Sequence, residues 1–195
     1  MTYIIQTMNR LLLIVDPQID FISGSLAVNG AAKAMDALAD YLYKKDELYQ
    51  YKIVTNDWHP LNHCSFQRNG GSWPVHCVQY SIGAAIYPKL VEPLFNINST
   101  TKVLTKGNNP RIEEYSIFKN RSSANYINRI INMKQIEQID LCGIAGDFCV
   151  LDTLKDGIKF YGKDMFNVLM PYVVSIDNGK TLNEFVKNNS IKVTY

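Results

Sequence analysis

Residues 138–150 read Gln-Ile-Asp-Leu-Cys-Gly-Ile-Ala-Gly-Asp-Phe-Cys-Val, and this segment joins two kinds of pattern. Its first half is an apolar run bounded by small residues, which is typical of a buried strand in a parallel sheet. Beyond it, helical spacing relates the apolar residues at positions 150, 151, 154 and 158. Cys149 is therefore expected where a strand ends and a helix begins. The free amides of a helix start stabilise an anion, so we expect a lowered pKa for the Cys149 thiol.

The alternation of strand and helix patterns continues on both sides of this segment. We expect strands at 9–16, 51–56 and 101–105, from 138, and at 165–170 and 191–195. We expect helices at 31–43, at 122–133 with Ser122 or Ser123 as the cap, from 150, and at 181–187. The segments 18–30, 78–100 and 108–120 are interpreted as loops. This order predicts a three-layer α/β/α fold around a mostly parallel sheet of about six strands.

Length and composition limit the function classes. The chain has 195 residues, of which 47% are hydrophobic and 19% are charged, so we expect a single domain over residues 1–195. A net charge of +2 gives no argument for nucleic-acid binding, and no apolar run approaches the length of a membrane span. Residues 1–10 lack the basic start and apolar centre of a signal peptide, so we expect a cytoplasmic protein that needs no disulfides.

Polar residues stand at the ends of four predicted strands. They are Asp16, Asp57, Lys106 and Cys149. Each has an ordinary explanation by itself: an aspartate or lysine in a turn, or a small buried cysteine. Ligands of parallel sheets bind at the carboxyl ends of the strands, and all four residues belong to that edge. Their combination therefore favours an active site.

A possible metal site follows the second predicted strand. Asp57 and His59 are two residues apart on an extended segment, so their side chains leave the same face. The chain has three histidines, at positions 59, 63 and 76, all in this region. Carboxylate and imidazole ligands suit a metal with open positions, whether zinc, iron or manganese. Two alternatives are histidines that cap turns and a closed zinc site using residues 63–64 and 76–77, which lacks the usual Cys-x2-Cys spacing.

Several segments resemble the isochorismatase-like cysteine hydrolases, and among them the nicotinamidases. The matching segments are 13–21, 24–28, 57–66, 73–77, 106–107, 115–118 and 143–150. They stand in the family's order and span most of residues 11–158. The resemblance implies the family's Rossmann-like α/β/α fold and the hydrolysis of nicotinamide to nicotinate and ammonia, as in NAD salvage. It also implies that pyrazinamide is accepted.

The resemblance assigns roles to the reacting groups. Cys149 matches the nucleophile, Asp16 the base that takes its proton, and Lys106 the third member of the catalytic set. The family has a cis peptide before the residue that matches Ala145. The backbone amides of Ala145 and Cys149 would then donate to the developing oxyanion.

The resemblance also implies one divalent metal ion, with zinc favoured over iron or manganese. Asp57, His59 and His76 would hold it, and it would bind the pyridine nitrogen of the substrate. Phe21 and Trp73 would form the aromatic walls of the ring pocket. His63 is not counted as a ligand.

One departure and two alternatives accompany this interpretation. Phe148 stands where relatives often have a polar residue or tyrosine, which would change the rim of the pocket. The main alternative is another amidase or hydrolase of the family that uses Asp16, Lys106 and Cys149 on a different small molecule. A non-catalytic binding module with the same fold is the second. The sequence is compatible with a homo-oligomer and points to a small-molecule partner, with no nucleic acid or membrane.

Overall fold

A six-stranded parallel sheet forms the middle layer of the computed structural model, which describes residues 8–95 and 100–195. Its strands are β1 (Arg10–Val15), β2 (Tyr51–Asp57), β3 (Thr101–Lys106), β4 (Gln138–Ile144), β5 (Phe166–Val174) and β6 (Lys192–Thr194). Their order is β3-β2-β1-β4-β5-β6. The strand order reverses between β1 and β4, and such a switch point leaves a crevice at the carboxyl ends of these strands. The predicted three-layer fold is confirmed.

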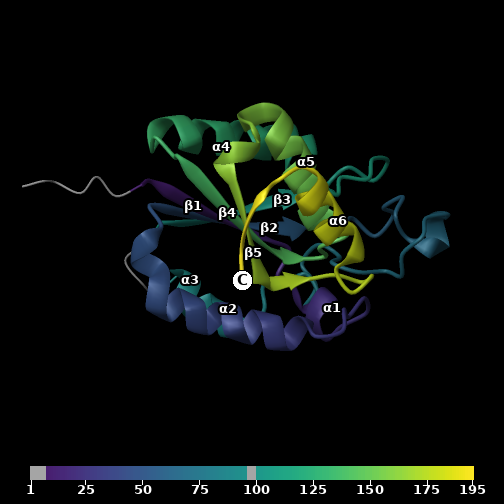
Figure 1. Cartoon of the computed structure of the whole chain (residues 1–195). Helices are drawn as coiled ribbons and strands as arrows, with labels where there is room; N and C mark the ends of the chain where they lie inside the picture. The colour runs from purple at the N-terminus through teal and green to yellow at the C-terminus, as the bar shows by residue number, and fades with distance from the viewer. Residues whose placement is uncertain (1–7, 96–99) are drawn as a thin grey trace, which may run out of the picture.

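Helices cover both faces of the sheet (Figure 1). The helices α4 (Arg121–Met133), α5 (Cys149–Tyr161) and α6 (Lys180–Asn188) lie on one face, and α1 (Ile19–Ile22), α2 (Ala31–Lys45) and α3 (Pro88–Phe95) lie on the other. Short 3-10 helices occur at Asp46–Leu48, Gln67–Asn69, Ile117–Lys119 and Lys163–Met165. Strand β1 shows why the central strands must be apolar throughout. Its side chains alternate between the two hydrophobic clusters, with Leu11, Leu13 and Val15 in one and Leu12 and Ile14 in the other.

Helix α3 corrects one prediction, because it lies within the segment 78–100 that was interpreted as a loop. Pro88 begins this helix, at the position where a missing N–H costs nothing. Pro93 lies inside the helix and hides its periodicity. Leu90 and Leu94 are four residues apart and both are buried in the same cluster as α2, so tertiary packing outweighs the proline.

Three smaller predictions are also corrected. The short helix α1 lies in the segment 18–30 that was interpreted as a loop. Asn120, and not Ser122 or Ser123, caps α4, because its side-chain oxygen accepts a hydrogen bond from Ser123 N. Strand β5 continues past Pro171 to Val174, through an irregularity in its pairing with β4 where a missing N–H is tolerated.

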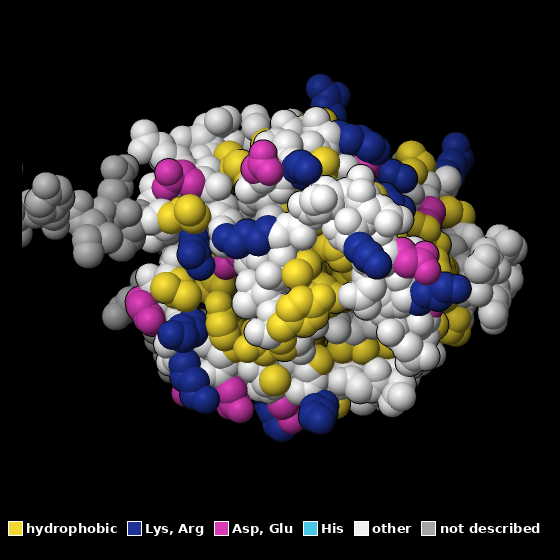
Figure 2. Space-filling model, in the orientation of Figure 1, with side chains coloured by type: hydrophobic (Ala, Val, Ile, Leu, Met, Phe, Trp, Pro, Cys, Tyr) yellow, Lys and Arg dark blue, Asp and Glu magenta, His cyan; other side chains and the backbone are white. Residues whose placement is uncertain are grey.

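The surface gives no sign of a single dominant charge. Lysines, arginines, aspartates and glutamates are scattered over the face in Figure 2, and hydrophobic side chains gather near its middle. All three histidines are buried, and none shows on this face. Among residues 8–95 and 100–195, no helix combines the length and the apolar character that a membrane span requires.

Gly157 tests the packing of α5 on the sheet. A methyl group at this position would overlap the rings of Phe166 and Phe118. We expect Gly157→Ala to lower the free energy of unfolding by about 1–3 kcal/mol, because overpacking forces buried rings apart. At a solvent-facing position of a helix, a glycine-to-alanine change would instead raise the free energy of unfolding by up to about 1 kcal/mol. Urea unfolding measures the difference, with Lys159→Ala on the exposed face of α5 as the control. A gain in stability would contradict the tight packing.

Candidate active site

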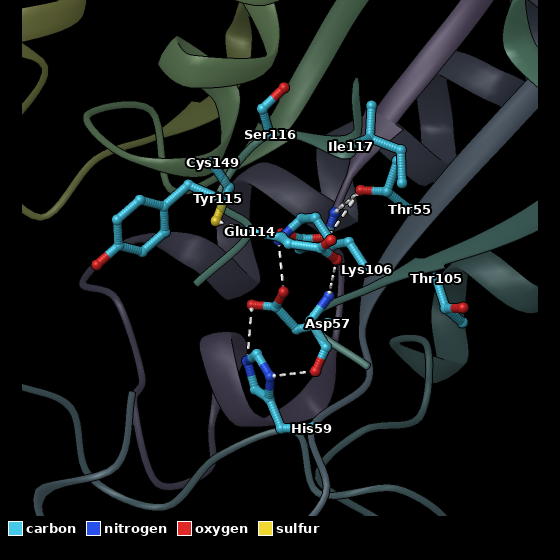
Figure 3. A network of polar contacts seen from close by, with 12 residues as sticks. Thr55, Asp57, His59, Thr105, Lys106, Glu114, Tyr115, Ser116, Ile117 and Cys149 are labelled. Carbon is cyan, nitrogen blue, oxygen red and sulfur yellow. Dashed lines mark hydrogen bonds and ion pairs between the residues drawn. The ribbon is translucent and has the colours of Figure 1, made fainter. Parts of the chain in front are cut away.

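Lys106 stands at the centre of four strand ends (Figure 3). Asp16 follows β1, Asp57 ends β2, and Cys149 begins α5 directly after the turn that leaves β4. The Lys106 Nζ atom lies 2.8 Å from Asp16 Oδ2, 2.5 Å from Asp57 Oδ1 and 3.5 Å from Cys149 Sγ. The exposed fractions of these four side chains are all 6% or less. The structure therefore brings together the four polar residues that the sequence placed on one edge of the sheet.

Two carboxylates allow Lys106 to keep its charge in a buried place. Burial alone would lower the pKa of Lys106, but Asp16 and Asp57 outweigh it and raise this pKa well above its ordinary value. A buried charge persists only when it is paired and hydrogen-bonded. The ammonium is therefore a fixed positive charge beneath the sulfur.

Asp16 is held so that its carboxylate can exchange a proton. Its Oδ1 accepts a hydrogen bond of 2.7 Å from the Thr55 hydroxyl, and its backbone N–H donates to Thr55 O. Burial raises the pKa of Asp16, Lys106 opposes the increase, and the Asp57 charge adds to it. A carboxyl whose pKa is raised above its ordinary value is a better proton acceptor, which suits a general base.

Cys149 does not behave as the sequence predicted. Burial raises the pKa of its thiol well above the ordinary value, and the neighbouring Lys106 charge does not compensate. The expected lowering at a helix start is wrong here, because the sulfur is excluded from water and the nearby Asp16 and Asp57 carboxylates also disfavour a thiolate. The resting group is a thiol, and the Asp16 carboxylate lies within 4.8 Å of its sulfur.

Three side chains next to this centre fit a divalent metal ion. One ligand atom from each of Asp57, His59 and His76 lies within 4.8 Å of the others. His59 Nδ1 is 3.1 Å from Gly107 O and His76 Nδ1 is 2.7 Å from Pro74 O. Because a carbonyl oxygen only accepts, each Nδ1 carries a proton, and Nε2 is the nitrogen that is left to bind a metal. The buried Nε2 of His59 has no hydrogen-bond partner among the described residues, which is the state of a ligand atom.

Asp57 completes this donor set as an anion. Burial would raise the pKa of Asp57, but Lys106 and His59 outweigh it and hold this pKa far below its ordinary value. One of its oxygens bonds Lys106, and the other lies 3.6 Å from His59 Nε2. Burial would lower the pKa of His59, but the Asp57 charge outweighs it and raises this pKa, so a bound metal would displace a proton from the ring. A charged carboxylate with two imidazoles is a donor set that divalent metals accept with positions left open.

His63 has a different role from the other two histidines. Its Nδ1 accepts hydrogen bonds from the hydroxyl and the N–H of Ser65, and its Nε2 lies 3.2 Å from Ile112 O, to which it donates. Both nitrogens are thus occupied. Burial lowers the pKa of His63 to about 4, so the ring is neutral. It packs with its centroid 4.0 Å from that of His59 and supports that ring without a free lone pair of its own.

A pocket opens above the sulfur between these groups. The residues that line it are Phe21, Leu26, Val28, Asp57, Trp73, His76, Glu113, Tyr115, Ala145, Phe148, Cys149 and Ile176. Trp73 donates a hydrogen bond of 2.9 Å from Nε1 to the Tyr115 hydroxyl and packs edge-on against Phe148 at 5.0 Å. The aromatic walls expected from Phe21 and Trp73 are therefore extended by Tyr115 and Phe148.

The backbone around Ala145 supplies hydrogen-bond donors beside the sulfur. A cis peptide bond joins Ile144 and Ala145, as the resemblance implied. The carbonyl of Ala145 accepts from Phe148 N and Val150 N. Within the described chain, the backbone N–H groups of Ala145 and Cys149 donate no hydrogen bond. These two N–H groups are therefore free, and they are the donors that the resemblance assigns to an oxyanion.

Sequence reasoning missed several residues of this site. Gln18 is fully buried, and its side-chain amide bonds both the N–H and the carbonyl of Asp57, at 2.7 and 2.8 Å. The only feature of the sequence that indicated a role for Gln18 was its position, as a polar residue just after a strand end. Glu113 and Tyr115 lie in the segment 108–120, which was interpreted as a loop without a role for them. Ile176 lies where the sequence carried no signal.

The isochorismatase domain model matches residues 10–160 of the chain. The nicotinamidase of Escherichia coli is 32% identical over 171 residues, covering 77% of this chain and 76% of that protein. The nicotinamidase/pyrazinamidase of Mycobacterium tuberculosis is 33% identical over 155 residues, covering 77% of this chain and 79% of that protein.

Solved structures agree over almost the whole chain. The pyrazinamidase of Pyrococcus horikoshii in complex with zinc has a TM-score of 0.80 at 30% identity, covering 95% of this chain and 98% of that one. PnC1 from L. infantum in complex with nicotinate has a TM-score of 0.82 at 30% identity, covering 96% and 93%.

The donor set predicts different effects for two of the histidines. We expect the protein to bind about one divalent ion per chain. His76→Ala removes one of three donors and should leave only a small fraction of the bound metal. His63→Gln keeps a hydrogen-bond donor and acceptor near Ser65 and Ile112, so the metal content should stay close to that of the wild type. Elemental analysis after incubation with Zn²⁺ and gel filtration measures both. Equal losses in the two variants would make His63 a ligand as well.

Proposed function

The chain belongs to the isochorismatase domain family, and on this premise we propose that it is a nicotinamidase, which hydrolyses nicotinamide to nicotinate and ammonia. One observation carries the proposal: a nucleophilic sulfur, two of the three metal-binding side chains and the aromatic walls all face one pocket. The pocket is mostly apolar, as a site for a flat aromatic ring should be. Pyrazinamide has a ring of the same shape, and we expect it to be accepted.

The ring is positioned by residues of this chain on two sides. Phe21 and Trp73 line the pocket and would pack against the pyridine ring. A divalent ion held by Asp57, His59 and His76 would supply a Lewis acid for the ring nitrogen. We propose zinc, which suits these donors and occupies the pyrazinamidase structure of Pyrococcus horikoshii. With the ring so fixed, the carboxamide carbon faces the Cys149 sulfur.

The first half of the reaction forms a thioester. Asp16 takes the thiol proton as Cys149 Sγ attacks the carboxamide carbon, so no free thiolate has to persist in the buried site. The carbonyl oxygen becomes negative and accepts hydrogen bonds from the amides of Ala145 and Cys149, each worth roughly 3 kcal/mol in such sites. The carbon–nitrogen bond then breaks, and Asp16 returns its proton to the nitrogen as ammonia leaves.

The second half regenerates the thiol. Asp16 takes a proton from water, and the resulting hydroxide attacks the thioester carbon. The same amides hold the second oxyanion. When the carbon–sulfur bond breaks, the proton on Asp16 passes to Cys149, and the acid product loses its own proton to solvent and leaves as nicotinate. Lys106 keeps its charge throughout and limits the cost of the anionic states around it.

Ammonia release from nicotinamide tests this function. We expect steady release by the zinc-loaded protein and a loss of roughly 10⁴-fold or more in Cys149→Ala, because a catalytic unit fails when its nucleophile is removed. Cys142→Ala is the matched control, since Cys142 is also fully buried but lies in the α2-side core within β4. Removal of metal by a chelator should also abolish release.

The possible outcomes separate the parts of the proposal. Release that survives chelation would contradict the role of the metal while leaving Cys149 in place. Full activity of Cys149→Ala would contradict the nucleophile. A folded, zinc-loaded protein that releases no ammonia would exclude nicotinamide as the substrate.

The pH profile should report the environment of Asp16. Activity needs Asp16 without its proton, so kcat/KM should fall as the pH falls through the pKa of this group, which burial raises above the ordinary aspartate value. The Thr55 hydroxyl stabilises the charged form, so Thr55→Val should move this acidic limb to higher pH. Thr55→Ser keeps the hydroxyl and should leave the limb in place. An unchanged limb in Thr55→Val would show that another group controls it.

A further inference from the structure

The turn at Lys106 and Gly107 links the two halves of the site. Lys106 ends β3 and carries the central charge, and the next carbonyl, Gly107 O, accepts the hydrogen bond from His59 Nδ1. Gly107 has φ +69°, and a side chain there would overlap the His59 ring. The turn and the imidazole are therefore in direct contact, and a displacement of one displaces the other.

Glu114 holds this turn without lining the pocket. Its side chain is buried, and Oε2 accepts hydrogen bonds from Gly107 N at 2.8 Å and from Asn120 Nδ2 at 3.2 Å. A hydrogen bond from a backbone amide to a carboxylate is shorter and stronger than one between neutral groups. Of the two neighbouring glutamates, Glu113 lines the pocket and Glu114 does not.

The peptide unit between Lys106 and Gly107 is held at both of its polar ends. Its N–H donates to Glu114, and its carbonyl, Lys106 O, accepts from Trp58 N at 2.9 Å. Trp58 lies between Asp57 and His59 in the sequence, so this chain of hydrogen bonds ends within the metal-binding segment. Hydrogen bonds that run through one amide polarise and strengthen each other.

We propose that Glu114 is a positioning residue for the metal site, acting through the Gly107 turn to fix the orientation and tautomer of His59. The inference rests on the proposed function, because it concerns the metal that this function uses. Groups that orient a metal-binding histidine commonly change metal affinity by about 10- to 100-fold when they are lost. Glu114 acts on His59 through the backbone of Gly107, so it would affect metal binding without being a metal ligand.

Two variants of equal length isolate the hydrogen bond from the charge. Glu114→Gln and Glu114→Met both remove the negative charge, but only glutamine keeps an oxygen that accepts from Gly107 N. We expect the dissociation constant for Co²⁺, measured by competition with a chelating dye, to rise about 10- to 100-fold in Glu114→Met. In Glu114→Gln it should stay within about threefold of the wild type. The visible absorption of bound Co²⁺ should also change only in Glu114→Met.

Asn120→Ala controls for a merely structural role. This change removes the other partner of Glu114 and the cap of α4 but leaves the bond to Gly107. It should lower the thermal midpoint and leave Co²⁺ affinity within about threefold of the wild type. If Glu114→Met does not fold, Glu114→Asp replaces it, because the shorter side chain withdraws the carboxylate from Gly107.

The outcomes distinguish this inference from the proposed function. Equal Co²⁺ affinities in Glu114→Met and Glu114→Gln would overturn the positioning role while the metal site stands. A comparable loss in Asn120→Ala would overturn it too, since stability alone would then explain the effect. A wild-type protein that binds neither Co²⁺ nor Zn²⁺ would overturn both the metal site and the inference.

Discussion

The buried ammonium of Lys106, held between the carboxylates of Asp16 and Asp57, is the interaction on which the site depends. A charge excluded from water is stable only when its partners are in place. Here the two partners have different proposed roles, because Asp57 belongs to the metal site and Asp16 is the general base. Asp57 remains an anion because Lys106 is beside it, which suits a metal ligand. Burial raises the pKa of both Asp16 and Cys149, and Lys106 opposes both increases, so the same charge favours the anionic form of each group. In the proposed function, one positive charge thus serves both proton transfer and metal binding.

The sheet explains why groups so distant in sequence meet at this charge. All neighbouring strands are parallel, so every strand ends on the same edge. Asp16 and Cys149 leave the two strands that flank the switch point, β1 and β4, and Asp57 and Lys106 end the next two strands on one side. The residues of β1, β2 and β4 are buried almost throughout, so these attachment points are rigid. The precision of the site comes from strands packed on both faces, and the loops add His59, His76 and the pocket walls.

The parts of this arrangement that could be predicted are those with a local signal. Apolar runs mark the central strands, and a polar residue at the end of such a run marks Asp16 or Lys106 without knowledge of the fold. Helix α3 was missed because its two prolines hide a periodicity that packing against α2 confirms. Gln18 and Glu114 were missed because their roles are hydrogen bonds to backbone groups that only the folded chain brings near. The wrong expectation for the Cys149 thiol has the same origin, since a sequence shows a helix start but not the exclusion of water from it.

The histidines show most clearly how backbone contacts assign roles to identical side chains. Gly107 O accepts a hydrogen bond from Nδ1–H of His59, and Pro74 O accepts one from Nδ1–H of His76, which leaves Nε2 of each ring as the nitrogen that can bind a metal. For His63 the contacts are reversed, since the Ser65 groups donate to Nδ1 and the carbonyl of Ile112 accepts a hydrogen bond from Nε2–H. A cluster of three histidines therefore offers two candidate ligands and one supporting ring. Residue type and spacing could propose that cluster, but only the tautomer fixed by each carbonyl decides which members can bind a metal.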